Sequence, residues 1–438
     1  MGLFFVLHFW VSWALADSGC PVRLLSTSFG NRHTHTAIYE EPASIVVLKD
    51  GYRPADQTSH ARVPVLSAQS AKAPVPFGNA RAFASLPDPD GVGAFYAVVG
   101  ADGLAHLSLP WGKTLPLMVG EDQNIRSVAF HRPPLASLVN ERADLEHGIK
   151  FKSERVEFSP EKQTQLEKQL GIRLYLATNG AVYETLLQYR RLAGMPRSLT
   201  QALLTNALLV LSDEERKPVD HFPLEVEYLD LGALDDGKSY LFASPDPEFG
   251  IELSGLSKVY TFEENERPEF LQVPSTQFLV SASTAGNISV VDLWKNRVYV
   301  QPRLPGIGWI RSLSAHAVGT EVEIWALNGT DGRLYHWRTD ALTPLMKPTL
   351  EIPNAGTPQQ VATFGSPLHG YYSPEQQGTH GYFANFLIDP RGTSIEQVLV
   401  LDADGKIHAL RHDLQGFMGR LETDPARKWD SFVFPPSK

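Results

Sequence analysis

The chain has 438 residues, of which 43% are hydrophobic and 10% aromatic, which is enough for a large buried core. Its formal net charge is −10 and its basic residues form no stripe, which argues against nucleic acid as a partner. Beyond the N-terminus, no stretch approaches the roughly 20 apolar residues of a membrane span.

The first sixteen residues are typical of a secretory signal peptide. They are apolar from Met1 onward and end in Ala14-Leu15-Ala16, a small-residue pattern that suits cleavage, although a basic n-region is missing. A buried strand is the alternative interpretation. We expect residues 1–16 to be removed, residues 17–438 to form one domain, and the protein to be secreted. Cys20 is the only cysteine, so no intramolecular disulfide forms.

Alternating apolar runs that flank glycine-containing turns recur along the chain. The strongest copy is the hairpin at Glu321 to Arg338, which turns at Asn328 to Gly332. The turn glycines of all copies, with the faintest at 51 and 255, are Gly51, Gly103, Gly180, Gly255, Gly286, Gly332 and Gly405. Their unequal spacing favours one four-stranded blade per turn, with loops of different length. We predict an all-β fold, a β-propeller of six blades, or seven if every faint mark counts.

A second repeated pattern contains arginine. Asn79 to Ala84, Asn124 to Ala129 and Trp309 to Ser314 share one shape. The first and third each fit the innermost strand of a blade, and the second fits if an insertion separates it from the turn at Gly180. This places Arg81, Arg126 and Arg311 near the central channel, where they either contact a ligand or pair with neighbouring carboxylates. Trp309 adds a stacking face for the same ligand.

Four other segments have predicted structures. Val22 to Thr27 is expected to be a strand of the first blade. Ser159 to Leu170 fits a short helix with an N-cap serine and a proline in its first turn. Leu208 to Leu211 fits a buried strand, although the leucines around it also have helical spacing. Trp429 to Phe434 is expected to pair with N-terminal strands and close the ring.

Familiar catalytic signatures are missing from the sequence. It contains no Gly-x-Ser-x-Gly elbow, no His-Glu-x-x-His, no phosphate loop and no cysteine cluster. His33 and His35 are a close pair without a third ligand nearby in sequence, and Asp402 to Gly405 begins like a calcium loop but lacks its closing glutamate. We therefore expect no metal and no cofactor.

The segment from Leu368 to Phe383 combines aromatic rings, imidazoles, hydroxyls and glycines, so it is the best candidate for ligand contact. A long loop packed by its own aromatic residues is the alternative. The side chains expected to contact a ligand are His369, Tyr371, Tyr372, His380 and Tyr382. Two glycosylation sequons, at Asn287 and Asn328, fall on predicted turns, which fits a secretory route.

The hairpin from Trp325 to Trp337 resembles a blade of the tectonin and fungal fucose-lectin propellers, whose blades end in a similar Asp-Gly turn. This resemblance implies a propeller architecture and, as one possible function, a secreted carbohydrate-binding lectin. Those lectins reuse one sugar site in successive blades, whereas the blades here diverge. One composite site is therefore the better inference.

A secreted propeller with lectin-like blades and divergent loops also resembles the fungal hetero-Diels-Alderases of tropolone-sesquiterpenoid, eupenifeldin-type pathways. The resemblance implies a cofactor-independent enzyme that joins a tropolone-derived quinone methide to a humulene-type sesquiterpene. Its expected catalytic residues are Arg311, His369 and Tyr371, and its expected substrate-binding residues are Arg81, Arg126, Trp309, Tyr372, His380 and Tyr382. A lectin is the second reading, and a hydrolase or lyase on the same fold is the third.

Overall fold

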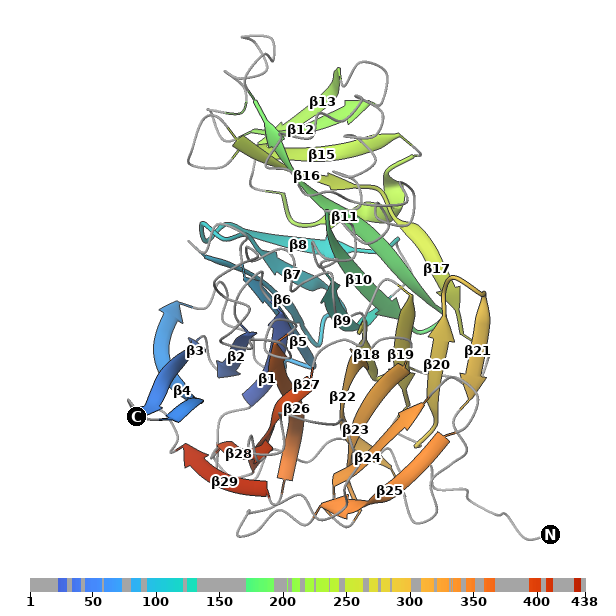
Figure 1. Ribbon diagram of the computed structural model, residues 1–438. Helices are drawn as coiled ribbons and strands as arrows, with labels where there is room; N and C mark the ends of the chain where they lie inside the picture. The colour runs from blue at the N-terminus through green and yellow to red at the C-terminus, as the bar shows by residue number, and fades with distance from the viewer. Residues whose placement is uncertain are drawn as a thin grey trace, which may run out of the picture.

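The computed structural model describes residues 23–29, 34–40, 44–56, 59–72, 80–87, 93–120, 124–131, 171–192, 203, 207–212, 217–223, 226–235, 237–243, 249–262, 268–274, 277–283, 286–300, 309–318, 321–330, 332, 334–339, 344–350, 358–366, 394–402, 407–412 and 429–434. These residues are almost entirely β-strands, arranged as six sheets around a ring (Figure 1).

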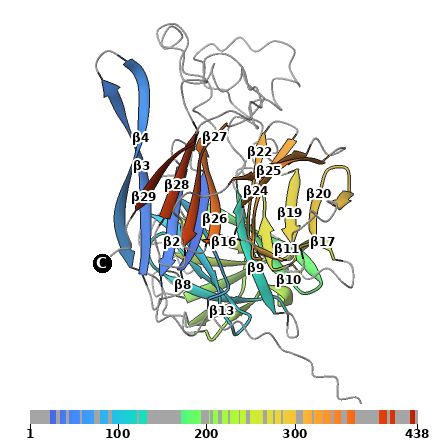
Figure 2. The ribbon, with the colours of Figure 1, turned by 90° about the horizontal axis from the view of Figure 1, so that it is seen from below.

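The first three blades come from the N-terminal half of the chain. Their strands, taken outward from the centre, are β1 (Arg23–Phe29), β2 (Thr34–Glu40), β3 (Ser44–Asp56) and β4 (Ser59–Lys72) in blade 1; β5 (Ala82–Pro87), β6 (Ala94–Val99), β7 (Ala105–Ser108) and β8 (Thr114–Met118) in blade 2; β9 (Ile125–His131), β10 (Ile172–Thr178), β11 (Ala181–Arg191) and β17 (Ser257–Thr261) in blade 3. The long hairpin of β3 and β4 extends past the neighbouring blades (Figure 2).

The last three blades each use four consecutive strands. These are β18 (Phe270–Gln272), β19 (Phe278–Ala282), β20 (Ile288–Asp292) and β21 (Arg297–Val300) in blade 4; β22 (Ile310–Val318), β23 (Glu321–Asn328), β24 (Leu334–Thr339) and β25 (Pro344–Leu350) in blade 5; β26 (Pro358–Ser366), β27 (Ser394–Asp402), β28 (Ile407–His412) and β29 (Trp429–Phe434) in blade 6. The hairpin predicted at Glu321 to Arg338 is confirmed as β23 and β24.

The innermost strands form the ring and run in the same direction. Each of β1, β5, β9, β18, β22 and β26 lies beside the next one, and β26 lies beside β1. The amide of Ser85, halfway along β5, donates to Ser26 Oγ, halfway along β1, at 2.9 Å. Each blade has four strands that pair antiparallel in succession, so its fourth strand ends at the face where its inner strand began, and the next inner strand starts from that same face. All of them therefore begin at one face of the ring, the entry face, and end at the opposite exit face.

The sheet topology confirms the six-bladed all-β propeller but not its predicted closure. Pairing between Trp429 to Phe434 and an N-terminal strand is wrong, because β29 pairs with β28 while β1 pairs with β2. Each terminal segment supplies a complete blade of its own, so no strand is shared between the two ends. The ring closes where β26 lies against β1.

An insertion between β11 and β17 extends blade 3. Its main strands are β12 (Ala207–Ser212), β13 (Pro218–Pro223), β15 (Lys238–Ala243) and β16 (Phe249–Ser254), followed outward from β11 in the order β16, β15, β12, β13. These strands project outside the ring at the top of Figure 1. The strand predicted at Leu208 to Leu211 is confirmed within β12, whereas the predicted helix at Ser159 to Leu170 lies outside the described residues. Gly255 connects β16 to β17, so it marks the insertion and not a seventh blade.

Strand β14 (Leu229–Asp230), the 3₁₀ turn η1 (Leu231–Ala233) and the exposed edge formed by β13 complete this region. Strand β14 pairs in parallel with β8, and η1 follows it. The outermost strand β13 begins and ends with proline, which cannot donate a ladder hydrogen bond, and Asp220 Oδ1 accepts from the amide of His221 at 2.8 Å. These features protect an exposed sheet edge from pairing with other chains.

Blades 3 and 4 are apolar on both faces. In β10, Leu174 and Leu176 pack into the core shared with blade 2, while Tyr175 and Ala177 face the core shared with blade 4. Blade 4 continues the pattern, with one face packed on blade 3 and the other on blade 5. Burial of each large apolar side chain stabilises the fold by about 1.5–3 kcal/mol. The strands therefore read as nearly continuous apolar runs.

Removal of the Ser312 hydroxyl tests the inter-blade contacts. Ser312 Oγ in β22 accepts from the amide of buried Val361 in β26 at 3.1 Å. Ser312→Ala leaves this amide without a partner, and we expect the free energy of unfolding to fall by about 1–3 kcal/mol in urea titrations. Ser127→Ala is the matched control, because Ser127 is the equivalent buried serine of β9 and the described residues give it no such bond. Equal effects of both variants would contradict the assigned role of Ser312.

Candidate functional site

The three arginines of the repeated pattern stand at equivalent places. Arg81 directly precedes β5, Arg126 is the second residue of β9, and Arg311 is the second residue of β22. These strands are innermost, as the pattern predicted, so all three residues lie at the entry face. Arg81, Arg126 and Arg311 belong to blades 2, 3 and 5 respectively. Their surroundings differ, and this difference distinguishes a structural arginine from a candidate ligand contact.

Arg126 is bound to its neighbours. Its Nη1 lies 2.8 Å from Oε1 of Glu269, which directly precedes β18, the inner strand of blade 4. Its Nε donates to Oδ1 of Asn179, in the turn between β10 and β11. Both side chains of the ion pair are partly buried. Arg126 therefore joins two blades, and this contact favours the carboxylate-pairing interpretation for this residue.

Arg311 lies over an aromatic ring. Its guanidinium carbon is 4.9 Å from the centroid of the Trp309 ring. Burial lowers the pKa of Arg311, which nevertheless keeps its charge at neutral pH. The Trp309 ring packs so closely on Gly329 that a Cβ there would lie 2.1 Å from it, and the Gly329 amide donates to the Trp309 carbonyl at 3.0 Å. A glycine in the neighbouring hairpin thus allows the cation–π pair to form.

Arg81 differs from both. Its side chain is exposed, and its backbone amide donates to the Val99 carbonyl at 2.8 Å. Trp325, in β23 of the same blade as Arg311, is buried at 2% exposure. Among the three arginines, Arg311 is the one that lies over an aromatic side chain, at the entry face of the propeller.

Five side chains of the aromatic segment were predicted to contact a ligand, namely His369, Tyr371, Tyr372, His380 and Tyr382, and all of them lie outside the described residues. The described strands on either side are β26, which ends at Ser366, and β27, which begins at Ser394, and these two residues pair at the exit face. That this segment contacts a ligand together with the arginines stays a prediction.

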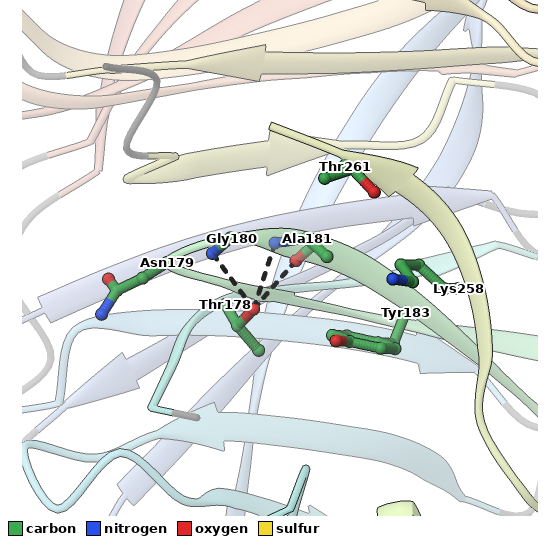
Figure 3. Close-up of a pocket in the computed structure, with 7 residues that line it drawn as sticks. All are labelled: Thr178, Asn179, Gly180, Ala181, Tyr183, Lys258 and Thr261. Atoms are coloured by element: carbon green, nitrogen blue, oxygen red, sulfur yellow. Dashed lines mark hydrogen bonds between the residues drawn. The ribbon is translucent and has the colours of Figure 1, made fainter. Parts of the chain in front are cut away.

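A pocket of about 310 Å³ lies on blade 3, near the entry face (Figure 3). It was not predicted. The turn between β10 and β11 forms one side, and β11 with β17 forms the other. The lining residues are Thr178, Asn179, Gly180, Ala181, Tyr183, Lys258 and Thr261. The turn was visible in the sequence as Asn179-Gly180, but the contribution of β17 depends on pairing across the inserted strands.

The two sequons occupy turns but differ in exposure. Asn287 is exposed between β19 and β20. Asn328 is 0% exposed, and its Oδ1 accepts from the Thr330 amide at 2.9 Å. The Asn328 side chain is therefore part of the folded turn between β23 and β24, and the predicted glycan does not fit there.

A buried polar cluster lies between blades 3 and 4, at the exit face. His131 ends β9 and is opposite Arg173 of β10, whose Nη1 lies 2.9 Å from Oε1 of Glu184. Burial and the neighbouring Arg173 charge lower the pKa of His131 to about 4. His131 Nε2 has no hydrogen-bond partner in the described part of the chain. His131 is therefore neutral at physiological pH.

The described residues offer no candidate for a metal site or for a membrane-spanning helix. No three or more His, Cys, Asp or Glu side chains among the described residues are grouped to hold a metal ion. The described part of the chain also contains no helix that is long and apolar enough to cross a membrane.

Comparisons with known proteins identify no family. No protein-family model and no curated protein matches the chain. Among solved structures, the WD40 β-propeller domain of Doa1 is 10% identical at a TM-score of 0.38, and the alignment covers 92% of this chain and 96% of that one. The structure of U3-55K is 10% identical at a TM-score of 0.36, with 94% and 95% covered. These similarities are low, so the propeller assignment rests on the sheet topology.

The difference in exposure between Asn287 and Asn328 can be tested by their glycosylation. In a eukaryotic secretory host, we expect peptide mass spectrometry after endoglycosidase treatment to find a glycan at Asn287 and none at Asn328, because a glycan on the buried amide would prevent the turn from folding. Asn287→Gln should remove the modification completely. A glycan at Asn328 in folded protein would show that the turn is placed wrongly.

The lowered pKa of His131 can be tested through the pH dependence of the free energy of unfolding. Its pKa is about 4 when folded and about 6.5 when unfolded, so the unfolded state binds more protons between these values. We expect the free energy of unfolding to fall as the pH decreases from about 6.5 to about 4, by up to about 1.4 kcal/mol per pH unit. His131→Gln should flatten this slope in urea titrations, whereas His221→Gln, at an exposed site, should leave it unchanged. An unchanged slope in His131→Gln would contradict the assignment.

Proposed function

We propose that this propeller is a cofactor-independent hetero-Diels-Alderase, which joins a tropolone-derived quinone methide to a humulene-type sesquiterpene. The observation that carries the proposal is the pair of Trp309 and Arg311 at the entry face, with the guanidinium 4.9 Å from the ring centroid. The pair combines a flat apolar surface with a fixed cation in a partly buried place. The proposed site lies on blade 5, where the inner strand begins.

The reaction makes few chemical demands on a protein. The heterodiene of the quinone methide adds to an alkene, so that one C–C and one C–O bond form and a dihydropyran ring results, with no atom lost and no electron supplied. Catalysis then depends on holding two apolar partners in a reactive orientation. It also depends on a donor at the carbonyl oxygen, where negative charge develops.

The Trp309 and Arg311 pair supplies both requirements. The indole face suits the planar quinone methide, and Arg311 provides N–H donors whose charge does not depend on pH. Gly329 and the Trp309 carbonyl fix the ring against the hairpin of β23 and β24, so the cation is positioned before substrate arrives. A fixed donor in a partly buried site stabilises developing charge more than a solvated one does.

A lectin is less well supported. The sugar sites of such propellers recur from blade to blade, and the turns compared here differ in kind: Thr178 caps the turn of blade 3 by its hydroxyl, whereas Asn328 caps the turn of blade 5 by its amide oxygen. Divergent turns favour one composite site for a small molecule. Secretion remains a prediction of the N-terminal sequence.

Incubation with a tropolone quinone-methide precursor and humulenol, followed by chiral chromatography, tests the proposal. We expect one enantiomer of a dihydropyran adduct with the protein, and a slow racemic background without it. Arg311→Ala should lower turnover about 100-fold, the size expected for loss of one such donor. Arg297→Ala, at an exposed position on β21, is the matched control and should keep full activity.

Two results would contradict the proposal. Absence of acceleration or of enantiomeric excess would exclude pericyclic catalysis with these substrates. Full activity of Arg311→Ala together with a lowered melting temperature would make Arg311 a structural residue. Tight binding of glycans at several sites per chain would instead support the lectin.

A further inference from the structure

We propose that blade 3 carries a second, separate binding site: the pocket between the β10–β11 turn and β17 binds a small hydroxylated carboxylate of monosaccharide size. Its volume of about 310 Å³ is at the lower end of the range for small-molecule sites. All seven lining residues belong to blade 3, whereas Trp309 and Arg311 belong to blade 5. The proposal is therefore independent of the pericyclic reaction.

An irregularity in β17 brings the polar side chains together. Lys258 and Thr261 are three residues apart, so in a regular strand they would point to opposite faces of the sheet. The pairing with β11 shifts between Val182 and Tyr183, so that Lys258 is opposite Tyr183 while Thr261 is opposite Ala181. Ala181 and Tyr183 share a face, and the bulge therefore places Lys258 and Thr261 on that same face. Bulges commonly redirect side chains beside functional sites.

The turn forms a fixed opposite wall (Figure 3). The Thr178 hydroxyl accepts from the Ala181 amide and donates to the Ala181 carbonyl, both at 3.2 Å, so it holds the turn. Asn179 is held by Arg126, which is itself bound to Glu269. A Cβ placed at Gly180 would meet no atom within 4 Å, so the space above the turn is open to a ligand.

The lining decides the class of ligand. Lys258 forms none of the ion pairs recorded for the described residues, and its ammonium group favours an anion. Tyr183 and Thr261 offer hydroxyls that donate and accept, which suits a ligand bearing hydroxyls of its own. Lys258 is the one charged residue of the lining and offers a single positive charge, which suits a singly charged anion better than a multiply charged one such as phosphate. A single carboxylate with neighbouring hydroxyls meets these conditions.

Calorimetric and NMR titrations of the full chain with glucuronate, glucose and acetate test the site. Glucuronate presents both features, glucose presents hydroxyls alone, and acetate presents a carboxylate alone. We expect glucuronate to bind about three- to ten-fold more tightly than either of the others at low salt. Lys258→Gln should abolish the preference for glucuronate over glucose, and Thr261→Val should weaken both sugars. Lys217→Gln, which changes an exposed lysine beside β13, is the matched control and should behave like the wild type.

Four outcomes would overturn the proposal: equal binding of acetate and glucuronate, equal binding of glucose and glucuronate, no binding of any probe, or an unchanged preference in Lys258→Gln. Melting temperatures of the variants are measured in parallel, and both are expected to match the wild type because Lys258 and Thr261 are exposed. Lys258→Gln should also keep full pericyclic activity. Failure of this proposal is therefore distinguishable from failure of the proposed function.

Discussion

The whole architecture depends on blades that are apolar on both faces. Blade 3 contacts blade 2 through Leu174 and Leu176, and blade 4 through Tyr175 and Ala177, so neither face tolerates water. A single blade of this kind is not stable alone, because its second face needs a neighbour. Because the blades repeat around a ring, each apolar face is covered by the neighbouring blade. The ring closes where β26 of blade 6 lies against β1 of blade 1. The polar groups at the entry face are attached to this rigid frame, which is why Arg311 is fixed although it is partly exposed.

The features that the sequence predicted are local ones. Turn glycines with φ near +70° or +80°, such as Gly332 and Gly103, occur where a hairpin must reverse, and their signature is contained within a few residues. Arg126 and Arg311 were placed on inner strands because each lies in the short pattern that recurs at Asn79 to Ala84, which is again a local signature. Trp309 belongs to the same class, since its partner Gly329 lies in the next hairpin of the same blade.

The features that the sequence did not predict depend on distant pairing. Lys258 is opposite Tyr183 because β17 returns to pair with β11 after the inserted strands β12 to β16. The pocket was therefore invisible to local pattern. The expected closure by Trp429 to Phe434 was wrong for a similar reason, because periodicity shows that a segment is a strand but not which strand is its partner. The burial of Asn328 likewise depends on packing and not on its turn signature.

The closure of the ring has a mechanical consequence. Successive blades are joined by a covalent connection, but blade 6 and blade 1 have neither that connection nor, among the described strands, a shared hydrogen-bonded ladder. Separation of the ring at this boundary therefore has to break only the contacts between blades 6 and 1, whereas separation at any of the other five boundaries is also limited by the chain that joins the two blades.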